Sequence, residues 1–169
     1  MTASHILPDV LVPNLRIVFC GTAAGRMSAA TRTYYAHPQN QFWRALASAG
    51  LTPYQFAPRD YGLLLQYGIG LTDLAKHHAG MDAQIPAHGF DRVALEEKIR
   101  RYCPRILAFT SKTAGRIYCR HAVAYGLQAE SIGTTRIVVL PSPSPAARHA
   151  WNLAYWHELR ALAEEELRT

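Results

Sequence analysis

The residues of this chain that are suited to chemistry lie in three short segments, each placed directly after an apolar run. The first, Gly21–Gly25 (GTAAG), offers backbone amides with little side-chain obstruction, which suits an anion or a flat polar ligand. The second, Gly70–Leu74, holds Asp73, the one acid of the three segments. The third, Pro141–Arg148, is stiffened by three prolines and presents two serines and an arginine. A carboxylate beside such loops suits acid–base or electrostatic catalysis.

Each segment also has a purely structural interpretation. The first lacks the Lys-Ser/Thr ending of a phosphate-binding loop and the three-glycine dinucleotide spacing, which disfavours nucleoside triphosphates and NAD. Asp73 and Thr72 could simply cap a turn. In the third segment, Ser142 or Ser144 could cap the helix that follows.

A fourth stretch, Tyr34–Trp43 (YYAHPQNQFW), combines aromatic and polar residues. A tyrosine near the small-residue segment could stack on a nucleobase. Phe42 and Trp43 are predicted to belong to the core, whereas His37 before a proline fits either a buried hydrogen bond or a site.

Strands and helices must alternate to bring these segments together. We predict strands at 16–20, 68–74, 105–110 and 136–140, and helices at 41–49, 58–66, 92–102, 112–120 and 149–168. In this reading 21–25 is a loop, and the second strand delivers Asp73 to its end. The alternation predicts an α/β three-layer sandwich with a central, mostly parallel sheet and helices on both faces. Residues 1–169 are expected to form one domain, because no linker or repeat divides them.

Composition narrows the class of protein. With 169 residues, 49% of them apolar, the chain is long enough to bury a core, which excludes a mainly disordered protein. Lys and Arg outnumber Asp and Glu by 18 to 12, and the net charge of +6 favours a polyanionic partner. The three cysteines, Cys20, Cys103 and Cys119, show no zinc-binding spacing and are expected to be buried thiols. No apolar run approaches the roughly 18 residues of a membrane span, so a cytoplasmic protein is expected. No bound metal is expected either, because the cysteines lack a zinc-binding spacing.

Four ordered blocks resemble a known family. GTAAG after a strand, AHPQNQFW, GLTDL and LPSPSPAAR together are similar to the mismatch-specific uracil-DNA glycosylases of the uracil-DNA glycosylase superfamily, over about Leu11 to Arg148. The resemblance implies a base-flipping enzyme that cleaves the N-glycosidic bond of a damaged base in DNA and leaves an abasic site. It implies no metal and no organic cofactor. Double-stranded DNA is the implied partner, and a monomer is expected.

The sequence departs from that family at its catalytic position. The first motif usually reads Gly-Ile-Asn-Pro-Gly, and here Ala23 stands where the asparagine positions the attacking water, with Ala24 in place of the proline. Since a methyl group cannot orient water, another polar group is needed, and Asp73 is the candidate. A carboxylate stabilises the positive charge that develops on the sugar as the base departs.

The remaining site residues follow from the resemblance. The implied base pocket comprises Gly21, Thr22, Ala23, Ala24, Gly25, Ser28, Tyr35 and Asn40, with Tyr35 stacking on the flipped base. The second family motif, usually Asn-Pro-Ser-Gly with a later arginine, corresponds to the proline-rich segment. The implied DNA contacts are Ser111, Lys112, Ser142, Pro143, Ser144, Pro145 and Arg148.

The expected activity is therefore that of a monofunctional glycosylase acting on uracil, especially opposite guanine, with no lyase step. A hypoxanthine or xanthine glycosylase of the same superfamily is one alternative. The other, motivated by Ala23, is a catalytically silent DNA-binding module that has kept the fold.

Overall fold

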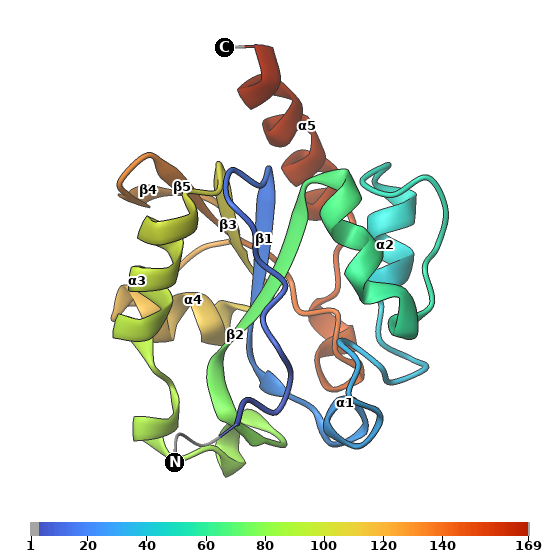
Figure 1. Cartoon of the computed structure of the whole chain (residues 1–169), viewed down its shortest axis with the longest axis vertical. Coiled ribbons are helices and arrows are strands. Elements are labelled where there is room, and N and C mark those ends of the chain that lie inside the picture. The colour runs from blue at the N-terminus through green and yellow to red at the C-terminus, as the bar shows by residue number, and fades with distance from the viewer. Residues whose placement is uncertain (1–3, 169) are drawn as a thin grey trace.

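A five-stranded sheet forms the centre of the computed structural model, which describes the backbone of residues 4–168 and the side chains of residues 4–165. The strands are β1 (Ile17–Ala24), β2 (Ile69–Ala79), β3 (Ile106–Phe109), β4 (Gly126–Ile132) and β5 (Thr135–Val139), in the spatial order β2-β1-β3-β5-β4. All neighbouring pairs are parallel except β4 with β5 (Figure 1). The carboxyl ends of β1, β3 and β5 therefore meet at one edge.

Helices cover both faces of the sheet. The α-helices are α1 (Arg26–Thr31), α2 (Phe42–Ser48), α3 (Arg92–Tyr102), α4 (Lys112–Cys119) and α5 (Ala154–Arg168), and 3₁₀ segments occupy Pro58–Tyr67, Asp82–Gln84, Ala87–Gly89 and Pro145–Ala150. One hydrophobic cluster joins the sheet to α2, α5 and the first 3₁₀ segment, and a second joins it to α3 and α4. The predicted α/β three-layer sandwich is confirmed.

The two-residue period of the strands divides the core. Phe19 of β1 packs against Phe42 of α2 and Trp156 of α5, with ring centroids 5.2 and 5.6 Å apart. Its neighbours Val18 and Cys20 point to the other face, toward α3 and α4. Gly21 follows the same alternation, so a side chain at that position would point to the Phe19 face.

Two strands extend further than expected. The prediction that β1 stops at Gly21 and that 21–25 is a loop is wrong, because β1 continues to Ala24 and pairs with β2 through Gly21–Asp73 and Ala23–Ala75. Asp73 accordingly lies in the middle of β2, not at its end. Backbone pairing with a parallel neighbour holds small residues extended even where their local preference is for a turn.

Three further expectations are corrected. β4 was not predicted, because most of its side chains are exposed and it lies at the sheet edge, where the apolar alternation is weak. The last helix begins at Ala154 and not at His149, since 145–150 form a separate 3₁₀ segment after the prolines. Cys103 is exposed, whereas Cys20 and Cys119 are buried as expected. Within the described residues, no helix is long and apolar enough to cross a membrane.

Candidate active site

Asp73 lies inside the protein beside the end of β1. The side chain is 6% exposed, and β2 places it directly across from Gly21. A Cβ atom at Gly21 would lie 2.9 Å from Asp73 Oδ1 and 3.5 Å from both Thr110 Oγ1 and Tyr35 Oη. Three polar groups from β2, the end of β3 and the segment after α1 therefore converge over one glycine. A side chain at position 21 would collide with the Asp73 carboxyl group, so glycine lets these three groups approach the strand.

Burial controls the charge of this carboxyl group. The pKa of Asp73 is raised from 3.8 to about 7, chiefly because the group is removed from water and in part because the charge of Asp9 is near. The charges of Lys76 and Lys98 and a hydrogen bond from the Gly21 backbone act in the opposite direction. A carboxyl group with a pKa near neutrality is suited to proton transfer at physiological pH.

The two lysines belong to a buried network behind Asp73. Lys76 Nζ lies 3.0 Å from Asp9 Oδ1 and donates to Tyr34 Oη at 3.1 Å. Lys98 Nζ lies 2.7 Å from the other oxygen of Asp9. Sequence reasoning missed this network, although a lysine in the otherwise apolar run after Asp73 was a visible signal. The network places positive charge near the site, with Lys76 buried and with Lys98 and Asp9 16% and 20% exposed.

Tyr35 is held in a defined orientation next to Asp73. Phe42 stacks on one face of its ring, with centroids 3.9 Å apart and planes 19° from parallel. The Oη atom and Thr110 Oγ1 are 3.2 Å apart. Burial and the charge of Asp73 raise the pKa of Tyr35 well above its ordinary value, so the hydroxyl stays protonated. Thr110 is a site residue that sequence reasoning missed, although it is the last residue of a predicted buried strand.

The backbone at Tyr35 is strained. Its φ of 51° lies in the left-handed region, which is uncommon for a residue other than glycine and costs on the order of 1–3 kcal/mol. Such strain persists where the surroundings over-determine a conformation, and it clusters at functional sites. The tyrosine expected to stack on a base is thus the residue that carries this strain.

The other residues of the first motif surround this centre. Ala23 pairs with Ala75 and offers no polar side-chain atom, while Gly25 is exposed at the start of α1. Thr22 Oγ1 donates to Asp82. Ser28 is buried, and its Oγ accepts from the Ala36 backbone at 3.1 Å. The Ser28 hydroxyl is therefore already used to hold the turn that positions Tyr35.

The aromatic block and the proline-rich loop are joined. Asn40 Oδ1 accepts from the Phe42 backbone at 2.9 Å, which places this side chain at the start of α2. The Gln41 backbone donates to the Pro143 carbonyl at 2.9 Å. The second bond connects segments about 100 residues apart in the chain, and the first gives Asn40 an architectural role. Figure 1 shows the 3₁₀ segment after Pro143, in orange, beside α1.

The expected DNA-contact residues surround the same edge of the sheet. Ser111 caps α4, because its Oγ accepts a hydrogen bond from the Ala114 backbone at 3.0 Å. Lys112 is exposed, and its Nζ lies 4.3 Å from the centre of the Tyr125 ring. In the third segment, Ser142 Oγ accepts a hydrogen bond from the Ser144 backbone, and Ser144 Oγ accepts one from the Ala146 backbone. Pro145 begins the 3₁₀ segment that follows. Arg148 is exposed at the end of this loop.

Of these groups, the cations Lys112 and Arg148 face solvent, whereas the serine hydroxyls shape the loops. Arg26, at the start of α1, adds a third exposed cation after a strand end. The edge therefore combines a buried carboxyl group, an oriented aromatic ring and a rim of positive charge. Two cavities elsewhere, one between β4 and α5 and one beside Asp9 and α3, contain none of the converging groups.

Comparison with known proteins gives two findings. The family model "Uracil DNA glycosylase superfamily" matches residues 8–164. The fold is similar to the solution NMR structure of a protein from Methanosarcina acetivorans described as a candidate uracil DNA glycosylase, with a TM-score of 0.62 and 23% sequence identity. That match covers 94% of this chain and 95% of the other, so the similarity extends over the whole fold.

Proposed function

Because the chain belongs to the uracil DNA glycosylase superfamily, we propose that it removes uracil, especially opposite guanine, from double-stranded DNA by hydrolysis and leaves an abasic site. The observation that carries the proposal is the Asp73 carboxyl group, buried over Gly21 with a pKa of about 7. It supplies an ionisable group in a chain whose first motif has Ala23 in place of the family's asparagine.

In the proposed reaction, the target nucleotide leaves the base stack and its base approaches Tyr35 at the carboxyl ends of the strands. Extrusion makes the glycosidic bond accessible, and stacking on an aromatic ring compensates part of the lost base stacking. Tyr35 is the stacking residue, since Phe42 already holds its ring in place. Stacking accepts every base, so base selection rests on polar atoms at the edge of the pocket.

Asp73 then acts on the sugar. As the bond to the base breaks, positive charge develops on the sugar ring, and a nearby carboxylate stabilises it. The ionised carboxylate also accepts a proton from the water that attacks the anomeric carbon. The water proton goes to Asp73, the bonding electrons leave with the base, and the hydroxyl group stays on the sugar.

The enzyme is proposed to be monofunctional. A lyase step needs a free amine near the sugar, and Lys76 is the buried amine three residues after Asp73. Its Nζ is engaged by Asp9 and Tyr34 at 3.0 and 3.1 Å, and an amine in an ion pair is a poor nucleophile. Borohydride treatment of a reacting mixture should trap no protein–DNA adduct, and a trapped adduct would refute this assignment.

Contact with DNA is assigned to the rim of the same edge. In this proposal Lys112 and Arg148 contact phosphates, and the rigid proline-rich loop enters the groove beside the orphaned base. Phosphate contacts position the duplex without reading its sequence. Phosphate contacts of this kind suit a glycosylase that must accept many sequence contexts around one lesion.

One observation favours a second candidate function. Ala23 has no group that could orient water, and this fits a DNA-binding module without catalytic activity. A hypoxanthine or xanthine glycosylase is a third outcome, because the same pocket chemistry applies to other deaminated bases.

The deciding experiment is base release under single-turnover conditions. Labelled duplexes carry one uracil, hypoxanthine, xanthine or thymine opposite guanine or adenine. Wild type is compared with Asp73→Asn, which keeps the size of the side chain and removes its charge, and with Glu97→Gln, which neutralises an exposed acid on α3. We expect uracil release by wild type and Glu97→Gln, and a loss of roughly 100-fold or more in Asp73→Asn.

Each other result has a defined meaning. Full activity in Asp73→Asn removes the charge of Asp73 from the mechanism. Release of hypoxanthine or xanthine without uracil changes the substrate and keeps the mechanism. Lesion binding without release of any base establishes the silent module.

A further inference from the structure

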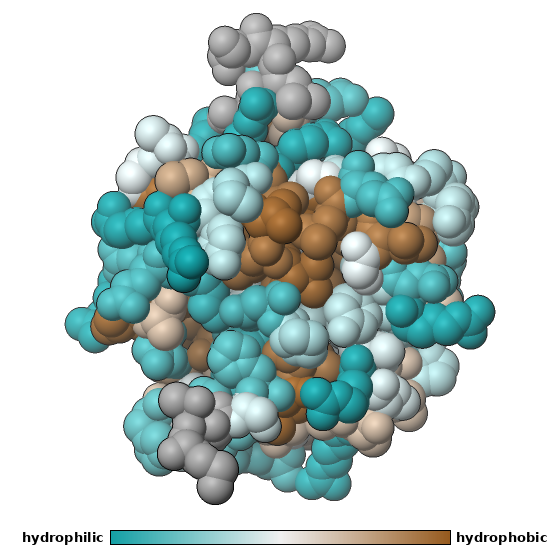
Figure 2. All heavy atoms as spheres, viewed as in Figure 1, coloured by the Kyte–Doolittle hydropathy of each residue, from teal (hydrophilic) through white to brown (hydrophobic). Residues whose placement is uncertain are grey.

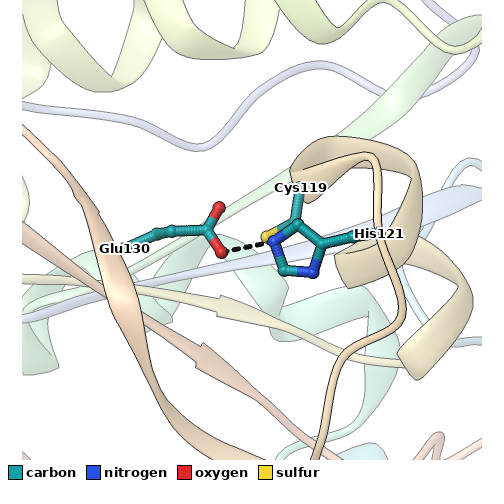
Figure 3. A group of neighbouring side chains, drawn as sticks. All are labelled: Cys119, His121 and Glu130. Atoms are coloured by element: carbon teal, nitrogen blue, oxygen red, sulfur yellow. Dashed lines mark hydrogen bonds and ion pairs between the residues drawn. The ribbon is translucent and has the colours of Figure 1, made fainter.

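A second group of reactive side chains lies outside the active site, where α4 ends. Cys119 is the last residue of α4, His121 follows two residues later, and Glu130 comes from the edge strand β4. One ligand atom of each, a sulfur, a ring nitrogen and a carboxylate oxygen, lies within 4.8 Å of the other two. Figure 3 shows the three side chains pointing toward one another.

A backbone carbonyl group determines which nitrogen of the His121 ring carries the proton. Its Nδ1 lies 2.8 Å from the Ala122 carbonyl oxygen, which can only accept, so Nδ1 carries the proton. This leaves Nε2 facing the cluster. Metal-ligating histidines commonly donate their second ring N–H to a backbone carbonyl in this way.

The short contact between His121 and Glu130 requires a positive charge between the two side chains. Nε2 lies 2.6 Å from Glu130 Oε1. With the proton on Nδ1, two lone pairs would face each other at that distance, so a second proton must lie between them, or a cation must take its place once the two atoms move apart. The buried sulfur of Cys119 beside this pair favours a thiophilic cation.

We propose that Cys119, His121 and Glu130 form a Zn²⁺ site with water as the fourth ligand. Thiolate, imidazole and carboxylate are the groups that bind zinc, usually in a tetrahedral arrangement. Zn–S and Zn–N bonds of about 2.3 and 2.0 Å place ligand atoms roughly 3.5 Å apart. The three atoms reach that spacing with small side-chain movements, because His121 and Glu130 are 54% and 42% exposed.

The site would act as a structural clamp. It joins the end of α4 to the edge strand across the connecting residues 120–125, at the opposite end of α4 from the Ser111 cap. Closing a loop with a metal restricts the unfolded chain and stabilises the folded one. The sequence analysis expected no metal, because Cys119 and His121 match no familiar ligand spacing and Glu130 is contributed by a strand that was not predicted.

Zinc and cobalt titrations of the full chain test the proposal. Equilibrium dialysis against ZnCl₂ should give one bound zinc per chain, and Co²⁺ should produce a thiolate charge-transfer band with the visible bands of a tetrahedral site. Cys119→Ser and His121→Ala should each weaken zinc binding at least about tenfold. Zinc should also raise the melting temperature of wild type but not of His121→Ala.

Matched controls separate this site from chance binding. Cys103→Ser removes the exposed thiol at the end of α3, and His157→Ala removes an exposed histidine on α5. Both should bind zinc as wild type does. His121→Ala alters an exposed side chain, so it decides the question even if Cys119→Ser fails to fold. Zinc binding that is absent in wild type, unchanged in His121→Ala, or lost in Cys103→Ser would overturn the proposal.

Discussion

The burial of Asp73 should make the protein less stable at neutral pH than a variant without that charge. The change is Asp73→Asn, which preserves the shape of the side chain and cannot ionise. The pKa of Asp73 rises from 3.8 to about 7 on folding. At about 1.36 kcal/mol for each pKa unit, ionising this group costs the folded state on the order of 4 kcal/mol relative to the unfolded state.

The sign follows from proton binding. Between pH 4 and pH 7 the folded state holds a proton on Asp73 that the unfolded state has already lost, so the free energy of unfolding falls as the pH rises. Above pH 7 both states are ionised and the loss is complete. Wild type and Asp73→Asn should therefore be similarly stable near pH 4, and the variant should be more stable by up to about 4 kcal/mol at pH 8.

Urea unfolding at pH 4, 6 and 8, followed by tryptophan fluorescence, measures this difference. Trp43 and Trp156 are buried and report on packing of the α2 and α5 side of the sheet. The contributions of other ionisable groups to the free energy of unfolding cancel when the variant is compared with wild type. For Glu97→Gln, the difference in stability from wild type should not change in this way with pH. A difference that does not change with pH, or a variant that is less stable at pH 8, would refute the account of Asp73 as a buried acid with a raised pKa.

Three further predictions concern activity and binding. Lys76→Met removes a charge that lowers the pKa of Asp73, so the pH–rate profile of base release should move to higher pH; a shift to lower pH contradicts this. Tyr35→Ala should weaken lesion binding, measured by fluorescence anisotropy, by about 1–3 kcal/mol, whereas Tyr35→Phe loses only the contact with Thr110 and should bind nearly as well. Arg148→Ala should weaken binding to every duplex and lower the salt slope by about 1; an effect confined to one sequence excludes a phosphate contact.

The prediction of the elements succeeded where one strong local signal was present. Arg92–Tyr102 forms α3 with the predicted bounds, because an apolar stripe at helical spacing is followed by Pro104, and Asp91 caps its start. The strand at 106–109 is buried on both faces and reads as a continuous apolar run. β4 escaped prediction because an edge strand with exposed side chains carries no such run.

Part of the candidate site could be predicted from the sequence because some of its residues also carry a strong local signal. Asp73 and Tyr35 stood out by residue type in otherwise apolar or aromatic surroundings. Thr110 and Lys76 did not, because their roles depend on the pairing of β1 with β2 and β3. Nothing in the order of residues along the chain shows which side chains meet above Gly21.

The sequence by itself determined the alternation of strands and helices, the basic charge and the chemical groups available, since these depend on residue type and spacing. Only the tertiary structure decided that Asp73 lies away from water with Lys76 behind it, and that Cys119, His121 and Glu130 face one another. The physical reason is that a pKa and a ligand set depend on distances through space and on the water that folding excludes.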